Sequence, residues 1–146
     1  MEKIKITLLM GCICILAIAC SSNTQIPSRI SVDKQITVAL YPANDSDLSG
    51  YPLSQCLLKD TVHISELLQY PGDEGITMPF SFSDSLKFAE ITEQNLKKRI
   101  AISINGKVMS CPVVKMRIDN GACSVVLDES QAKAIFPDVN LDHFKH

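Results

Sequence analysis

Residues 99–110 carry the strongest folding signal in the chain, an Asn-Gly pair between two runs of alternating apolar residues. Asn105 and Gly106 both tolerate a positive φ, which a type I′ turn requires at its two central positions. The pair therefore predicts an antiparallel β-hairpin between Arg99–Ile104 and Lys107–Ser110. A regular register would place Ile104 opposite Lys107, Ile102 opposite Met109 and Ile100 opposite Cys111.

Strand-like alternation also occurs on both sides of this hairpin. Thr61–Leu68 satisfies the helical and the strand period equally, so its structure stays open. A loop is expected over Pro42–Gly50, turns over Tyr70–Gly75 and Asp119–Gly121, and a bend or bulge at Pro112. Strands are expected over Gln35–Tyr41, Leu53–Leu58, Ile76–Phe82, Val113–Ile118 and Cys123–Leu127.

Two short helices are expected, and each begins with a capping signal. Ser83 or Asp84 can cap a helix that continues to about Gln94. Asp128–Gln131 has the spacing of a capping box, which opens a second helix to about Phe136. Strands mixed with two short helices and tight hairpins predict the α+β class, with a small mixed or antiparallel sheet.

The N-terminal segment has the pattern of a bacterial lipoprotein signal. Lys3 and Lys5 precede an almost unbroken apolar run, Ile6–Ala19. As a helix this run would be about 21 Å long, which is shorter than a hydrocarbon core of about 30 Å. A small residue followed by Cys20 and then a polar chain resembles a lipobox, so we expect the Cys20 thiol to receive a diacylglycerol, with acyl chains such as palmitate, before cleavage leaves Cys20 as the first residue.

Two other interpretations of this segment stay open. Leu9–Cys12 is a competing lipobox, but it would leave a signal core shorter than the usual length of about seven to fifteen residues. The other alternative is an ordinary signal, cut after Ala19, without lipid. The expected organisation is a signal peptide over 1–19, a lipidated N-terminus and polar tether over 20–34, and one domain over 35–146. Because no acidic run follows Cys20, the favoured location is the cell envelope, at the outer membrane and facing the periplasm.

The motifs between residues 76 and 136 resemble a known domain in their order and spacing. They are Phe80–Asp84, Lys87–Asn95, Lys98–Ile102, Asn105–Val114, Ile118–Gly121 and Leu127–Ala134. Together these motifs resemble the head subdomain of the first periplasmic loop of SecD, in the SecDF protein-translocation family. The resemblance implies the fold of that head and a contact with extended polypeptide during export. One departure is Cys111, which stands where the family usually has alanine, and no translocation motor, proton path or membrane channel is implied.

Few residues carry a signal for catalysis or metal binding. Beyond Cys20 the exported part has Cys56, Cys111 and Cys123, and we expect buried thiols rather than a disulfide of Cys56 with either of the others. His63 lies in the segment of open structure, and His143 and His146 lie in an end expected to fray. No Cys-x-x-Cys or His-x-x-x-His spacing occurs, so no catalytic residue, metal ligand or cofactor site is predicted.

Charge and motifs together favour a binding protein over an enzyme. The formal net charge is −2, which argues against nucleic acid and against electrostatic adsorption to anionic lipid. Lys97–Arg99 could touch an acidic partner, although such a run is more often a solvated helix end. The leading hypothesis is a non-enzymatic, membrane-anchored binding module for extended polypeptide. The alternatives are a small envelope hydrolase and a structural or inhibitory lipoprotein that binds one folded partner.

Overall fold

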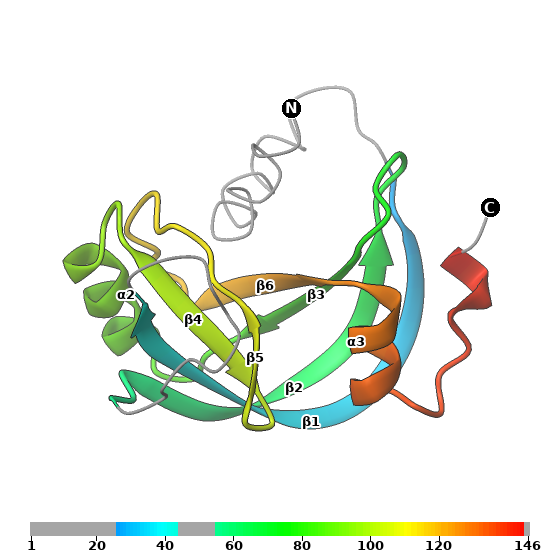
Figure 1. Cartoon of the computed structure of the whole chain (residues 1–146), viewed down its shortest axis with the longest axis horizontal. Coiled ribbons are helices and arrows are strands. Elements are labelled where there is room, and N and C mark those ends of the chain that lie inside the picture. Colours follow the sequence, from blue (N-terminus) through cyan, green and yellow to red (C-terminus); the bar gives the residue numbers. More distant parts are fainter. Residues whose placement is uncertain (1–25, 44–54, 145–146) are drawn as a thin grey trace.

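The computed structural model describes residues 26–43 and 55–144, which form one six-stranded sheet with short helices (Figure 1). The strand order is β5-β4-β1-β2-β3-β6, and neighbouring strands pair antiparallel. The strands are β1 (Ser28–Ala43), β2 (Leu58–Gln69), β3 (Ile76–Ser81), β4 (Arg99–Ile104), β5 (Lys107–Ser110) and β6 (Ala122–Leu127). The helices are α2 (Ser85–Gln94), α3 (Glu129–Ile135) and the 3-10 helix η1 (Leu141–Phe144).

The sheet curls so strongly that its two edge strands, β5 and β6, approach each other (Figure 1). The core fills the space that the sheet encloses, and α2 contributes the fully buried Phe88. Ile135 of α3 and Leu141 of η1 belong to the same core. The predicted α+β class holds in outline, with two short α-helices, but the antiparallel sheet makes up most of the fold.

Strand β1 begins at Ser28, so the tether predicted over 20–34 is wrong from that residue onward. Ile30 and Val32 are half-buried against the core and alternate with exposed residues, which is the pattern of a strand with one face covered. Lys34 interrupts the apolar alternation in the sequence. In the structure its Nζ donates a hydrogen bond of 2.5 Å to the Ile135 carbonyl and lies 5.8 Å from the centre of the Phe136 ring.

Strand β2 resolves the segment that the sequence left open, because Thr61–Leu68 is strand throughout. The pairing of β1 with β2 shifts register between Ser31 and Lys34. At this irregularity Ile64 and Leu67, three residues apart, both lie in the core, which accounts for the helix-like spacing. The strand expected over 53–58 is wrong where it can be examined, since only Leu58 of residues 55–58 is strand, and residues 53 and 54 lie outside the described residues.

The β4–β5 hairpin is confirmed, with φ of 51° at Asn105 and 88° at Gly106. Ile104 pairs with Lys107 as expected, but the register shifts between Ile102 and Ser103. The regular register was therefore wrong beyond the turn. Ile102 lies opposite Ser110, and the Ile100 N–H donates to the Pro112 carbonyl at 3.0 Å. The irregularity adds one residue on the β5 side, as a β-bulge does.

The strand expected over Val113–Ile118 does not form. After Pro112, which has no N–H to donate to a ladder, only isolated bridges remain, from Val113 to Arg99 and from Val114 to Leu96. The next strand, β6, pairs with β3 across the sheet and not with the segment that precedes it.

Both capping predictions are confirmed. The Asp84 side chain accepts a hydrogen bond of 2.9 Å from the Lys87 N–H at the start of α2. Asp128 and Gln131 form the predicted capping box at the start of α3. The end expected to fray is instead structured as far as Phe144, because Leu141 and Phe144 are buried on the side of η1 that faces the core.

We expect Asn105→Ala to destabilise the domain by about 1–2 kcal/mol, because alanine is strained in the left-handed conformation that Asn105 adopts. The Asn105 Oδ1 also accepts a hydrogen bond of 3.0 Å from the Thr37 N–H, and this bond would be lost. Urea unfolding measures the change. Asn105→Asp is the control, since aspartate tolerates a positive φ and keeps an acceptor. Equal losses in the two variants would contradict this account.

Candidate interaction surface

The segment 111–121 runs along α2 and is joined to it at several points. Beyond the end of the helix, the Lys97 N–H donates to the Val114 carbonyl at 2.8 Å, and the Val114 N–H donates to the Lys98 carbonyl at 2.8 Å. Lys97 has a φ of 67°, which is rare for a residue with a side chain. This conformation reverses the chain after α2 and brings it against the segment 111–121, which we call the loop.

Thr92 joins the middle of the loop to α2 through a buried hydroxyl. Its Oγ1 donates to the Ala89 carbonyl at 2.9 Å and accepts from the Ile118 N–H at 3.0 Å. Thr92 is completely buried, so the Ile118 N–H would otherwise lack a partner away from water. This side chain therefore determines where the loop packs on the helix.

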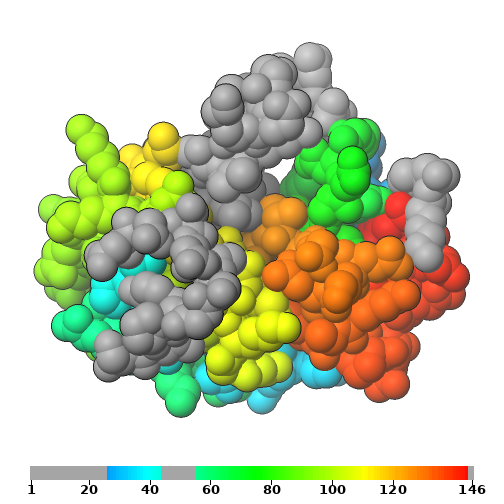
Figure 2. All heavy atoms as spheres, in the orientation of Figure 1, coloured from blue at the N-terminus to red at the C-terminus, as the bar shows by residue number. Residues whose placement is uncertain are grey.

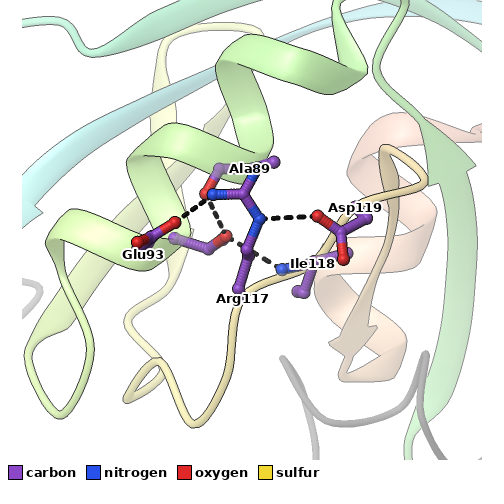
Figure 3. A network of polar contacts seen from close by, with 6 residues as sticks. Ala89, Glu93, Arg117, Ile118 and Asp119 are labelled. Carbon is purple, nitrogen blue, oxygen red and sulfur yellow. Dashed lines mark hydrogen bonds and ion pairs between the residues drawn. The ribbon is translucent and has the colours of Figure 1, made fainter.

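Arg117 lies on the outside of the same contact, between two carboxylates (Figure 3). Its Nε donates to Asp119 Oδ1 at 2.6 Å, and its Nη1 pairs with Glu93 of α2. The hydrogen bond to Asp119, followed by the one to Glu93, raises the pKa of Arg117 above its already high ordinary value. Stabilisation from a raised pKa is lost only when the pH climbs toward that value, so Arg117 stays charged throughout the neutral range.

Gly121 closes the other end of the loop against the start of α2. Its φ is 76°, and a Cβ at this position would lie 2.8 Å from the Phe82 carbonyl oxygen and 3.2 Å from the Ser85 Cβ. The Phe82 N–H donates to the Gly121 carbonyl at 2.9 Å. Only glycine allows this close approach, and with it the loop contacts both ends of the helix.

Exposed apolar side chains occur on this helix, on the turn that follows it and on the loop. Leu86 is 65 % exposed, Leu96 40 % and Met116 42 %, and the other large apolar residues of comparable exposure in the described residues are Ile26 and Val126. We call Leu86, Leu96 and Met116, together with Glu93 and Arg117, the α2 surface. Figure 2 shows residues of α2 and of the loop at one end of the molecule. Such a surface can make apolar contacts beside fixed charges.

The predicted lipidation site, Cys20, lies outside the described residues, as does the signal peptide expected over 1–19. Among the described residues, no helix is long and apolar enough to cross a membrane. The three cysteines that follow Cys20 are thiols, as expected. Cys111 and Cys123 are buried, but Cys56 is exposed, so burial was wrongly predicted for that residue.

The two histidines among the described residues contact partners other than the cysteine thiols. His63 Nε2 lies 2.6 Å from Asp33 Oδ1 on the exposed side of β1 and β2. His143 belongs to η1, and His146 lies outside the described residues. Over 26–43 and 55–144, no group of three or more His, Cys, Asp or Glu side chains could hold a metal ion.

Sequence reasoning missed the loop–helix contact. Glu93 of α2 pairs with Arg117, which is 24 residues away in the chain. Thr92 and Ile118 are 26 residues apart. The one available signal was a threonine on the apolar side of a predicted helix, where its hydroxyl needs a partner.

Residues 64–135 match the family model described as the SecDF P1 head subdomain. The chain is 26 % identical over 110 residues to the protein translocase subunit SecD of Magnetococcus marinus, covering 70 % of this chain and 21 % of that protein. It is 30 % identical over 79 residues to the subunit SecD of Endomicrobium trichonymphae, covering 52 % of this chain and 17 % of that protein. The subunit SecDF of Thermus thermophilus is 36 % identical over 50 residues, which are 34 % of this chain and 7 % of that protein.

The chain therefore spans about a fifth or less of the length of these relatives. A solved structure of SecDF, described as a membrane component that enhances protein export, aligns with a TM-score of 0.49 and 14 % identity. That alignment covers 89 % of this chain and 82 % of the other.

We expect Thr92→Val to cost about 1–3 kcal/mol of folding stability, because the buried Ile118 N–H loses its acceptor. Glu93→Gln is the control on the same contact, and it should cost less because its pair with Arg117 is exposed. Urea unfolding gives the two stabilities, and amide hydrogen exchange at Ile118 reports the local bond. The assignment fails if Glu93→Gln is the more damaging change, or if exchange at Ile118 is unaltered by Thr92→Val.

Proposed function

Because the chain carries a SecD-head-like domain, we propose that it is a membrane-anchored protein of the cell envelope that binds extended polypeptide during export. The observation that carries the proposal is the match of residues 64–135 to the SecDF P1 head subdomain. The matched range includes α2 and the loop that packs on it. The proposed role is binding and involves no chemical step.

The α2 surface suits a polypeptide that presents apolar side chains. Leu86 and Met116 are exposed on a helix and a loop that Thr92, Arg117 and Gly121 hold together. A surface that is already ordered loses little conformational entropy when a ligand binds, and this favours affinity. Apolar contacts of this kind discriminate little between side chains. A site that binds many different unfolded segments needs this tolerance.

Side-chain docking on this surface is a better mode of binding than the addition of a strand at an open edge. The two edge strands, β5 and β6, approach each other across the curled sheet. On β5, the Met109 carbonyl also accepts a hydrogen bond of 3.5 Å from Gln131 Nε2 of α3. An incoming strand needs a continuous row of unpaired backbone groups, and this arrangement interrupts the row.

The proposed anchor is a lipid on Cys20. The apolar run Ile6–Ala19 and the small-residue–cysteine junction support it. Since β1 begins at Ser28, only seven residues separate Cys20 from the sheet, and they span at most about 25 Å. Two or more acyl chains on one residue hold a protein stably at a bilayer. The domain would then work close to the membrane surface.

We expect a photo-crosslinking amino acid at Leu86 or Met116 to form adducts of many sizes in intact cells, as a binder of varied extended chains would. The same amino acid at Lys59, which is exposed on β2, is the control and should give few adducts. Immunoblots of the envelope fraction read the result. A single adduct of defined size would instead indicate one folded partner, and no adduct with any polypeptide would refute the proposal.

We expect Cys20→Ala to move the protein from the membrane fraction to the soluble envelope fraction, because the thiol that receives the diacylglycerol is lost. Cys12→Ala is the matched control. It removes the competing lipobox and should leave the protein in the membrane fraction. Mass spectrometry of the mature N-terminus identifies the modified residue. Release by Cys12→Ala, or retention of Cys20→Ala after signal cleavage, would show that the anchor is elsewhere.

A further inference from the structure

Three exposed lysines lie together at the end of the α2 surface. Lys97 and Lys98 follow α2, and Lys115 lies on the loop that pairs with them. The backbone bonds between Val114 and residues 97 and 98 bring the two segments side by side. Leu96, which forms a bridge to Val114, and Met116, which follows Lys115, are the exposed apolar residues of the same place. We call these five residues, Leu96, Lys97, Lys98, Lys115 and Met116, the basic patch.

The charge of the basic patch is not balanced within the described part of the chain. Arg117 is neutralised by Glu93 and Asp119, and Arg99 donates from Nη1 to the Cys111 carbonyl at 2.8 Å. In contrast, Lys97, Lys98 and Lys115 form no ion pair with any residue that the structure describes. Three positive charges therefore face solvent beside two apolar side chains, on a protein whose formal net charge is negative.

We propose that the basic patch binds acidic segments of extended polypeptide in which apolar residues lie next to Asp or Glu. This inference rests on the proposed function and names the class of segment that the site selects. Opposite charges speed the encounter and reject segments of like charge, while Leu96 and Met116 contact the apolar neighbours. The interaction is exposed, so salt should weaken it.

The position of the basic patch favours a polypeptide over the anionic surface of a membrane. Ala43, at the far end of β1, pairs with Arg99, and Arg99 forms a bridge to Val113 of the loop. The patch is therefore at the end of β1 opposite Ser28, where the proposed tether enters. Fifteen residue steps of the curved strand lie between the two ends, about 50 Å along the chain, and the negative net charge of the protein opposes adsorption to an anionic membrane.

Fluorescence anisotropy with the purified mature chain in neutral detergent tests this inference. The probes are two labelled twelve-residue peptides with the same apolar residues, one carrying Asp and Glu and the other carrying Lys in the same places. We expect the acidic peptide to bind at least about tenfold more tightly at low salt, with the preference shrinking as salt is added. Lys98→Glu with Lys115→Glu should abolish the preference.

Lys59→Glu with Lys107→Glu is the control of equal charge, because both lysines are exposed. Lys59 pairs with Ala39 and Lys107 pairs with Ile104, whereas the patch lies beyond Arg99, which pairs with Ala43. It should keep most of the preference, and circular dichroism verifies that both double variants are folded. Equal binding of the two peptides, or equal loss in the two double variants, would overturn the inference. The inference would also be overturned if the protein did not bind the acidic peptide but bound anionic lipid vesicles through Lys98 and Lys115. If crosslinking at Leu86 still captures polypeptide in these cases, only the charge preference is wrong and the proposed function stands.

Discussion

Strand β1 is hydrogen-bonded along both of its edges, and the rest of the domain depends on this. It pairs with β2 from Ser28 to Leu40 and with β4 from Val38 to Ala43. Its apolar residues Ile36, Val38 and Leu40 form the buried centre of the sheet. The first part of this long strand pairs with β2 and its last part with β4. Because of this arrangement the sheet curls and encloses a core that α2, α3 and η1 complete.

The same strand separates the two ends of the molecule. Ser28 pairs with Gln69 beside the turn between β2 and β3, whereas Ala43 pairs with Arg99 beside the α2 surface. At the Ala43 end, a buried hydroxyl, an ion pair and one glycine hold a loop without regular structure on the helix. A scaffold that positions an irregular loop precisely enough to expose selected side chains is a common way to build a binding surface.

The features that the sequence predicts well are those with a local cause. The Asn105-Gly106 turn and the caps at Asp84 and Asp128 depend on residues within a few positions, and all three form as expected. The β-bulge on β5, opposite Ile102, and the pairing of β6 with β3 depend on strands that meet only in the folded chain. In the candidate surface too, a local feature was predictable and a tertiary contact was not. Lys97–Arg99 was noticed as a charged run, but its juxtaposition with Lys115 required the tertiary contact at Val114.

The antiparallel pairing of β1 has a mechanical consequence. A pull between Ser28 and the α2 surface would act between the two ends of β1. Such a force loads the hydrogen bonds on both sides of the strand. Strand β1 can leave the sheet only when it loses its bonds to both β2 and β4, whereas an edge strand has one partner to lose.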